Sequence, residues 1–252
     1  KLKKDEESFL SVLKDYRVWI LFVVYAASFG MELTVYGTMD DYLQNTFGLT
    51  RSTAGNLVLS FALMNIFART LGGFFGDRFG RLKGLRGRVL FLTVILALEG
   101  VMLSTFSLAT SFAMGIIFLI AFSLTVQMAE GATFSVVPFI NKKAIGSISG
   151  IVGAGGNVGA FLAALLLKSK SAMAETNALA ANANLGEEAM KAAQSAAASG
   201  AVSSGYLIIG GFVIVTALTT LAIKFSAEDE KQVKEELQKA DTPVVKLSPS
   251  SI

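Results

Sequence analysis

The chain has 252 residues, of which 53% are hydrophobic and only 16% charged, and its net charge is +3. A soluble domain carries about 25% charged residues, so this composition excludes an ordinary soluble domain and is typical of a membrane protein. Cysteine and histidine are absent, which excludes disulfides and metal sites built on these two residues. Because position 1 is Lys rather than Met, and no apolar signal region follows, we expect the chain to be part of a longer protein.

Residues 1–16 mix charged and apolar side chains, which predicts a short cytoplasmic amphipathic segment at the membrane surface. Six apolar segments follow, each close to or above the roughly 20 residues that cross a bilayer as a helix. They cover residues 18–42, 53–76, 89–108, 112–140, 144–167 and 206–225. The sequence therefore predicts an all-α membrane protein with a six-helix transmembrane bundle at 17–225.

Two further stretches look less regular. Residues 169–205 are rich in Ala, Asn and Ser and offer no apolar face, which predicts an external loop with marginal helix. Residues 226–252 begin with a charged stretch of helical character and continue through two prolines, which predicts a cytoplasmic tail with a disordered end.

The basic residues predict the orientation of the bundle. With a cytoplasmic N-terminus, seventeen Lys and Arg residues fall on inner segments and four on outer segments. This bias follows the positive-inside rule, so we expect both termini to be cytoplasmic.

Arg69 lies well inside the second apolar segment, about five residues past its middle. A charged side chain inside a membrane span costs free energy, so we expect Arg69 to have a structural or functional role. Two interpretations stay open: a snorkelling side chain that reaches the headgroups, or an anion-binding guanidinium that faces a central cavity. The fork of a guanidinium suits a flat oxyanion. Asn65, one turn earlier, belongs to the same polar stripe.

The first apolar segment carries an aromatic face. Tyr25, Phe29, Glu32 and Tyr36 are spaced by four, three and four residues, so they share one side of a helix. Such a face is most often an interface with a neighbouring helix. Glu32 does not fit that interpretation, because a carboxylate near the middle of a membrane is a poor packing residue.

Glu99 and Glu130 raise the same question in the third and fourth segments, where Gln127 lies close to Glu130. With no histidine, any proton transfer falls to carboxylates. Each of these glutamates is a candidate for proton coupling, or for a structural ion pair or hydrogen-bonded lock, and the structural role is favoured for any single one.

The fifth segment is rich in glycine, with Gly153 and Gly156 beside Asn157. Glycines remove side chains from a wide helix face, so a neighbouring helix or a small ligand can approach the backbone. The second inner loop, GGFFGDRFGRLKGLRGR, places Asp77 before Arg78 and Arg81. The orientation of the bundle in the membrane explains the positive charges of this loop, but it does not explain the order of Gly, Asp and Arg.

These motifs resemble a known family. GGFFGDRFGR is similar to the loop signature that follows helices two and eight in the twelve-helix major facilitator superfamily. The stretches ASFGMELTVY, FALMNIFARTLGGFFGDRFGRLKGLRGR and EGATFSVVPFINKKAIGSISGIVGAGGNVGAF resemble its nitrate/nitrite porter family, and most of all the eukaryotic high-affinity nitrate transporters. GIVGAGGNVGAF resembles the second of that family's two nitrate signatures. The resemblance covers residues 17–168 and, more loosely, the last apolar segment.

The resemblance implies helices seven to twelve of the fold, without the N-terminal six-helix half and its own binding arginine. Arg69 then corresponds to the second substrate-binding arginine, on helix eight. Tyr25 and Phe29 correspond to aromatic positions that border the anion. Asn157 and the nearby glycines correspond to the signature on helix eleven, and Asp77 to the acidic residue that locks the cytoplasmic gate.

The resemblance further implies a secondary active nitrate or nitrite transporter that works by alternating access, with proton-coupled import across the plasma membrane. It implies no cofactor and no metal, and some eukaryotic relatives need an accessory membrane subunit. We expect no nucleic-acid partner. The alternatives are a porter for another small solute, a nitrate sensor that does not transport, and a membrane enzyme. Scattered carboxylates and the lack of His and Cys argue against an enzyme.

Overall fold

A computed structural model describes residues 9–231 and 233, and six long helices make up most of them. They are α2 (Tyr16–Phe47), α3 (Arg51–Lys83), α4 (Leu85–Ser107), α5 (Phe112–Val136), α6 (Ile145–Ala181) and α7 (Glu187–Thr219). Short 3-10 helices follow α5 and α7, namely η1 (Val137–Phe139) and η2 (Thr220–Ala222). Each long helix is apolar and long enough to cross a membrane. The prediction of an all-α, six-helix membrane bundle is therefore confirmed.

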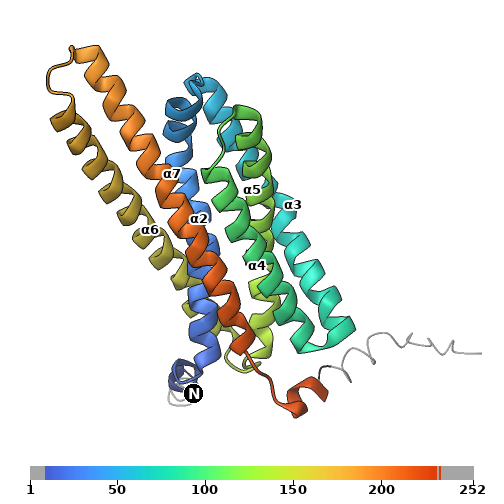
Figure 1. Cartoon of the computed structure of the whole chain (residues 1–252). Helices are drawn as coiled ribbons and strands as arrows, with labels where there is room; N and C mark the ends of the chain where they lie inside the picture. The colour runs from blue at the N-terminus through green and yellow to red at the C-terminus, as the bar shows by residue number, and fades with distance from the viewer. Residues whose placement is uncertain (1–8, 232, 234–252) are drawn as a thin grey trace, which may run out of the picture.

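The helices stand side by side in an up-and-down bundle that has two distinct ends (Figure 1). One end, called the terminus end, holds residues 9–15, the connections at 84 and 137–144, and residues 223–231 and 233. The other, called the hairpin end, holds the connections 48–50, 108–111 and 182–186. Residues 9–13 and 227–231 are helical. The rest of the predicted amphipathic segment and most of the predicted tail lie outside the described residues.

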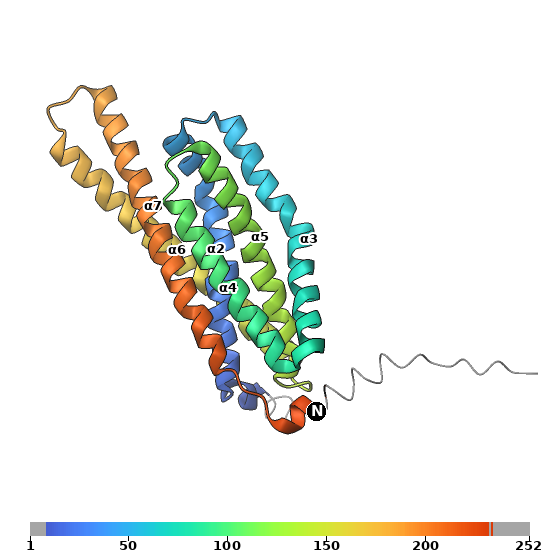
Figure 2. The ribbon, with the colours of Figure 1, turned by 45° about the vertical axis from the view of Figure 1, so that its right-hand side comes forward.

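Residues 169–205 differ from the predicted loop with marginal helix. Helix α6 runs to Ala181 and α7 begins at Glu187, so only residues 182–186 connect them. Alanine has the highest helix propensity of all residues, and each helix here extends one that is already nucleated. The side chain of Leu167 also lies against Gly205 across the pair. The two helices consequently form a hairpin that reaches past the other helices (Figure 2).

Local capping explains where several helices begin. Thr50 and Ser111 accept backbone N–H groups at the starts of α3 and α5. Asp15 caps α2 by accepting the backbone N–H of Arg17 at 2.9 Å, and it also binds the Arg17 guanidinium. Burial raises the pKa of Asp15, but the bonds and charge of Arg17 outweigh burial and bring the pKa below its usual value.

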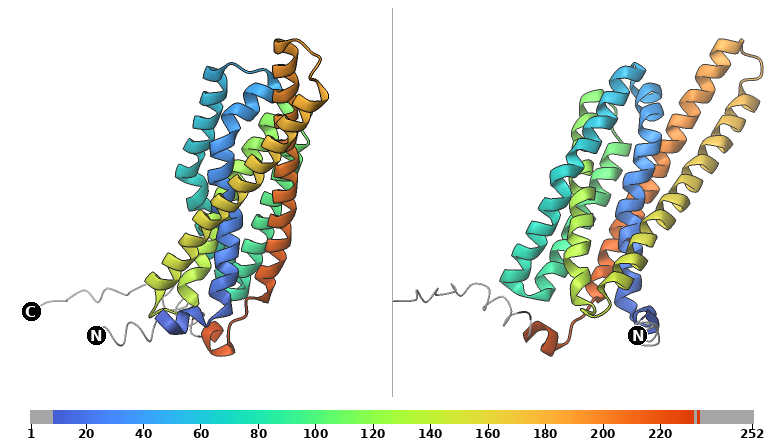
Figure 3. Two further views of the ribbon diagram at one scale, coloured as in Figure 1. Left: turned by 90° about the vertical axis from the view of Figure 1, so that its left-hand side faces the viewer. Right: turned by 180° about the vertical axis from the view of Figure 1, so that it is seen from behind.

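Backbones approach closely where α6 crosses α2 obliquely (Figure 3). A β-carbon on Gly30 in α2 would lie 2.7 Å from backbone atoms of Gly159 and Ala160 in α6. In the same way, a β-carbon on Gly100 in α4 would lie 2.6 Å from the carbonyl oxygen of Gly210 in α7. Only glycine fits such contacts, in which packing between backbones replaces packing between side chains.

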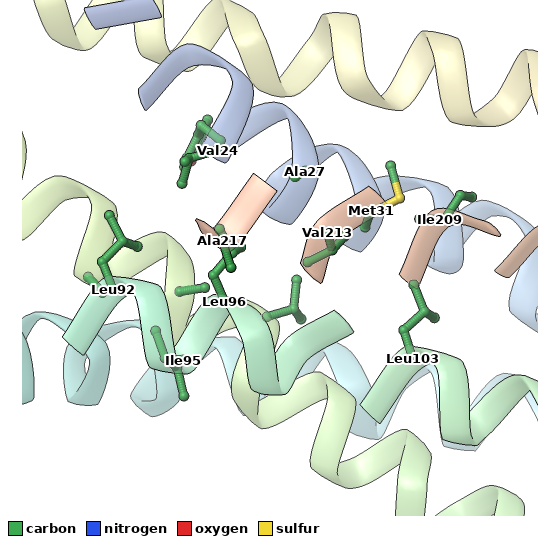
Figure 4. Packing of buried hydrophobic residues seen from close by; sticks show 14 of the residues in the cluster. Val24, Ala27, Met31, Leu92, Ile95, Leu96, Leu103, Ile209, Val213 and Ala217 are labelled. Atoms are coloured by element: carbon green, nitrogen blue, oxygen red, sulfur yellow. The ribbon is translucent and has the colours of Figure 1, made fainter. Parts of the chain in front are cut away.

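Apolar side chains of α2, α4 and α7 fill the space between these three helices (Figure 4). The residues labelled there are Val24, Ala27, Met31, Leu92, Ile95, Leu96, Leu103, Ile209, Val213 and Ala217. Helix α3 lies at the edge of the bundle and buries only a few small residues and Phe61. Its outer face, which includes exposed Leu63, Ile66 and Phe67, is left for lipid or another protein segment.

Candidate functional site

Two helices that meet backbone to backbone bring opposite charges together in the middle of the bundle. A β-carbon on Gly131 in α5 would lie 2.9 Å from the backbone nitrogen of Gly73 in α3 and would overlap the carbonyl of Arg69. This approach sets Arg69 beside Glu130, the residue before Gly131. The glycines of the GGFFG motif thus let α3 approach α5 closely.

Arg69 lies two residues past the midpoint of α3, which extends to Lys83 and is longer than its predicted segment. Its Nη2 donates to Glu32 Oε2 at 3.3 Å and forms a close ion pair with Glu130 Oε2. Its Nε is buried without a partner, and no described residue accepts a hydrogen bond from Nη1. The guanidinium is therefore engaged with α2 and α5 through Nη2, and Nη1 remains without a partner among the described residues.

Glu32 is held from three sides. Besides Arg69, Asn65 Nδ2 donates to Glu32 Oε1 at 2.8 Å and Gln127 Nε2 donates to the same oxygen at 3.4 Å. Gln127 also donates to the Phe61 carbonyl at 3.2 Å. These bonds connect α2, α3 and α5. We call Glu32, Asn65, Arg69, Gln127 and Glu130 the central cluster.

Glu130 is held much less firmly. Its side chain is fully buried, and Arg69 is its hydrogen-bond partner through Oε2, while Oε1 is buried without a partner. With both carboxylates ionised, the central cluster has two negative charges against one positive charge. A buried negative charge in excess is costly, so the cluster is suited to gain a proton or to change its pairing.

An aromatic wall borders Arg69. The guanidinium carbon lies 5.6 Å from the centre of the Phe29 ring, a distance typical of a cation–π contact. Phe29 stacks on Tyr25 with ring centres 5.2 Å apart, and Tyr25 meets Phe134 edge to face. Gly156 in α6 packs against the Phe29 side chain, where a β-carbon would lie 3.2 Å from Phe29 Cβ. The predicted aromatic face thus borders the central cluster.

A cleft of about 410 Å³ leads from Arg69 toward the terminus end. Arg69, Gly73, Gly131 and Phe134 line it near the central cluster, and Asp77, Arg88, Ser135, Pro138 and Phe139 line it farther along. The side chain of Arg69 is 38% exposed. Arg69, whose guanidinium is only partly paired, therefore borders the open space of the cleft.

The far part of the cleft holds a second charged group. Asp77 pairs with Arg88, which also donates to the Ser135 carbonyl at 3.2 Å and lies 4.6 Å from the centre of the Phe139 ring. We call this ion pair the terminus-end pair. The Arg88 side chain is 7% exposed, whereas that of Asp77 is 59% exposed. Sequence reasoning counted Arg88 only as an orientation charge, although its place in the first turn of an apolar helix marks it as unusual.

Other predicted residues lie outside these groups. Arg78 and Arg81 are exposed and form no ion pair with any described residue. Asn157 is exposed, and a β-carbon on Gly153 would meet no atom within 4 Å. In this six-helix bundle, Gly156 therefore reaches the aromatic wall, but Gly153 and Asn157 do not reach the central cluster.

Two further carboxylates stand out. Glu99 on α4 is fully buried, and neither of its oxygens has a hydrogen-bond partner. Glu230 accepts the backbone N–H groups of Leu85 and Arg86, each at 3.1 Å, and so fastens the short helix at 227–231 to the start of α4. Within the described part of the chain, no cluster of three or more acidic side chains is placed to hold a metal ion.

Comparison with known proteins gives several relatives, although no family model matches the chain. It is 42% identical over 154 residues to the high affinity nitrate transporter 2.5 of Arabidopsis thaliana, an alignment that covers 61% of this chain and 31% of the relative. It is 42% identical over 149 residues to the nitrate transporter 2.1 of Chlamydomonas reinhardtii, covering 59% and 27%. The nitrate/nitrite transporter NrtP of Picosynechococcus is 35% identical over 176 residues, covering 69% and 31%. The chain thus spans less than a third of each of these relatives.

A solved structure supports the fold. The crystal structure of a bacterial homologue of the human lysosomal transporter Spinster, in an inward-facing and unoccupied conformation, superposes with a TM-score of 0.66 at 16% identity. The match covers 90% of this chain and 53% of that chain. At this identity the likeness concerns the fold alone: the six helices are arranged as in about half of that transporter.

Proposed function

We propose that this chain, which is homologous to the high-affinity nitrate transporters of the major facilitator superfamily, forms the C-terminal half of a secondary active nitrate or nitrite transporter. In such transporters two helix bundles rock about a site near the middle of the membrane and open it to each side in turn. The N-terminal half of the site would come from six further helices.

The observation that carries this proposal is the position of Arg69. A cation in the middle of an apolar helix costs free energy, and such residues usually have a function. Arg69 has unpaired nitrogens, borders a cleft and touches an aromatic ring. A flat monovalent oxyanion fits it because the donors of a guanidinium lie in one plane. The surrounding apolar and aromatic groups strengthen the attraction by lowering the local dielectric.

A second half explains the incomplete enclosure of Arg69. Its side chain is 38% exposed although it sits at mid-helix. Lipid is a poor neighbour for such a group, so we propose that the facing half covers it and supplies a second cation. Gly153 and Asn157 would border the anion from α6 only in that complete assembly.

The rest of the proposal concerns direction and location. We propose cytoplasmic termini, a plasma-membrane location, proton-coupled import and, by analogy, an accessory membrane subunit. The terminus end is then the cytoplasmic end, where the positive charges gather as the positive-inside rule requires. The terminus-end pair would help to hold the cytoplasmic side closed in one state of the cycle, with Arg78 and Arg81 near the membrane surface.

Arg69→Ala in the full-length transporter tests the proposal. We expect nitrate uptake to be abolished, and Arg69→Lys to fail as well, because an ammonium does not offer the planar fork. Arg51→Ala is the matched control, since Arg51 is exposed at the hairpin end. The amount of each variant in the membrane is measured beside uptake. Uptake by Arg69→Ala equal to that of the wild type would remove Arg69 from the site.

The specificity of uptake separates the remaining alternatives. Nitrite and chlorate should compete with labelled nitrate if the site selects small flat or pyramidal oxyanions. A porter for another solute would show no such competition. A sensor would bind nitrate but give no flux in vesicles, so binding and flux are measured on the same preparation.

A further inference from the structure

We propose that Glu130 is the carboxylate that takes up the coupling proton, and that Glu32 is a positioning residue which stays in place. This inference rests on the proposed function and deepens it. A bound anion then competes with the Glu130 carboxylate for the single positive charge of Arg69, and a proton on Glu130 decides between them.

The two carboxylates differ in what remains to them once Arg69 leaves. Glu32 keeps the amide donors of Asn65 and Gln127 on Oε1. Glu130 keeps nothing, because Arg69 is its hydrogen-bond partner and its Oε1 is already buried without one. An ionised carboxylate without partners in an apolar interior is far too costly to persist. Glu130 must therefore be protonated whenever Arg69 turns to an anion.

The charge balance of the central cluster also indicates that Glu130 takes up the proton. With both glutamates ionised, the central cluster already has one negative charge in excess, and a bound nitrate would make that excess two. Neighbouring like charges repel each other strongly in a low dielectric. One proton on Glu130 removes the added charge. The anion is therefore bound together with a proton, which is the requirement for symport.

Other titratable groups lie on the helices that pack against α5, and none of them offers Glu130 a further partner. They include Tyr25, Glu32 and Tyr36 on α2, Arg69 and Asp77 on α3, and Glu99 and Arg88 on α4. Asp77 and Arg88 are paired with each other. Glu99 also lacks a partner, but it makes no contact with Arg69, so it serves as the control for a buried carboxylate outside the cluster.

The proposed cycle conserves charge and protons. A proton from water binds Glu130, the ion pair with Arg69 opens, and Arg69 binds a nitrate oxygen. The bundle reorients, nitrate leaves, and Glu130 gives its proton to water on the other side as it pairs with Arg69 again. Gly131, next to Glu130, lines the cleft through which water can reach this part of α5.

The experiment uses the full-length transporter in proteoliposomes, with nitrate as the probe. It measures nitrate accumulation driven by an imposed proton gradient, nitrate-for-nitrate exchange, and nitrate affinity against pH. For Glu130→Gln we expect accumulation to fall at least tenfold, with exchange that persists and no longer depends on pH. Glu99→Gln should accumulate nitrate like the wild type. Glu32→Gln leaves the proposed titrating group in place and should therefore keep the pH dependence of nitrate affinity.

The outcomes separate the two proposals. Proton-driven accumulation by Glu130→Gln at the wild-type level would overturn the assignment of the proton, as would an equal loss in Glu99→Gln. If the wild type neither binds nor exchanges nitrate, the proposed function fails instead.

A measurement on the wild type covers the case in which Glu130→Gln does not fold. Nitrate affinity should rise as pH falls, by up to about tenfold per pH unit for one coupled proton. Glu130→Asp keeps a titratable group and should retain proton-driven accumulation. A wild-type affinity that is independent of pH would reject the inference while leaving nitrate transport intact.

Discussion

The protein contains two groups of paired charges in or beside the helix bundle, the terminus-end pair and the central cluster, and they differ in charge balance and in burial. In the terminus-end pair, one arginine meets one carboxylate, so the charges balance, and a backbone carbonyl and an aromatic ring lie beside Arg88, although its Nε is buried without a partner. In the central cluster, one arginine is shared by two buried carboxylates, and nitrogen and oxygen atoms remain without partners. The first group is balanced and the second is not.

On the proposed function, this difference separates a structural contact from the substrate site. Opening a charge-matched pair raises the free energy of the protein, so the pair favours one arrangement of the helices. A mismatched cluster has no fully satisfied state of its own, and a proton or an anion completes it in different ways. Unsatisfied buried polar atoms are rare in proteins and usually have a functional reason.

The largest expected effect comes from removing the shared cation. Arg69→Ala leaves two buried carboxylates without their charge partner, which costs about 3–5 kcal/mol. The double variant Arg69→Ala/Glu130→Gln should regain a good part of that stability, because one buried charge has been removed. Thermal unfolding in detergent measures both. Equal unfolding temperatures for the single and double variants would contradict the claim that Glu130 depends on Arg69.

A smaller effect is expected where α3 and α5 hold the cluster together. Gly131→Ala places a β-carbon 2.9 Å from the Gly73 nitrogen and pushes the two helices apart, at a cost of about 1–3 kcal/mol. Gly73→Ala is the matched control, since its β-carbon would meet only the Gly131 carbonyl oxygen at 3.9 Å. Unfolding temperature and nitrate affinity should fall for Gly131→Ala alone. A similar loss in both variants would point to helix flexibility instead.

The terminus-end pair should respond in a graded manner. Arg88→Ala removes the ion pair, the bond to Ser135 and the ring contact, so we expect a loss of about 2 kcal/mol. Asp77→Asn should cost less, about 1 kcal/mol, because Asp77 is largely exposed and an amide oxygen can still accept. Chemical denaturation gives both values. The comparison of balanced and unbalanced clusters would break down if Asp77→Asn changed the pH dependence of nitrate affinity as Glu130→Gln does.

The smallest effect concerns Asp15, a balanced pair at the start of α2. Its pKa is lower in the folded protein than in the unfolded chain, so its contribution is present above about pH 4 and is lost as the pH falls through the lowered pKa. The difference in unfolding temperature between wild type and Asp15→Asn should therefore be present at pH 7 and shrink as the pH falls below about 4. A difference that persists at low pH would assign it to the cap geometry rather than to charge.

Several features could be predicted from the residues alone. The six apolar segments, the all-helical fold and the membrane setting follow from hydropathy, which is a local property of the chain. The shared face of Tyr25, Phe29 and Glu32 follows from helix periodicity. Arg69 was identified because a charge inside an apolar helix is costly wherever its partner lies. The prediction from local sequence was wrong at residues 169–205: it expected a loop with marginal helix, whereas the structure has two long helices joined by residues 182–186.

The partners of these residues were decided only by the tertiary structure. Nothing in the sequence states that Arg69 meets Glu32 and Glu130, or that Asp77 pairs with Arg88 rather than with its neighbour Arg78. Such pairings depend on how each helix is rotated about its axis and on where glycines let two backbones meet. These are relations between segments far apart in the chain, so residue spacing within one helix does not contain them.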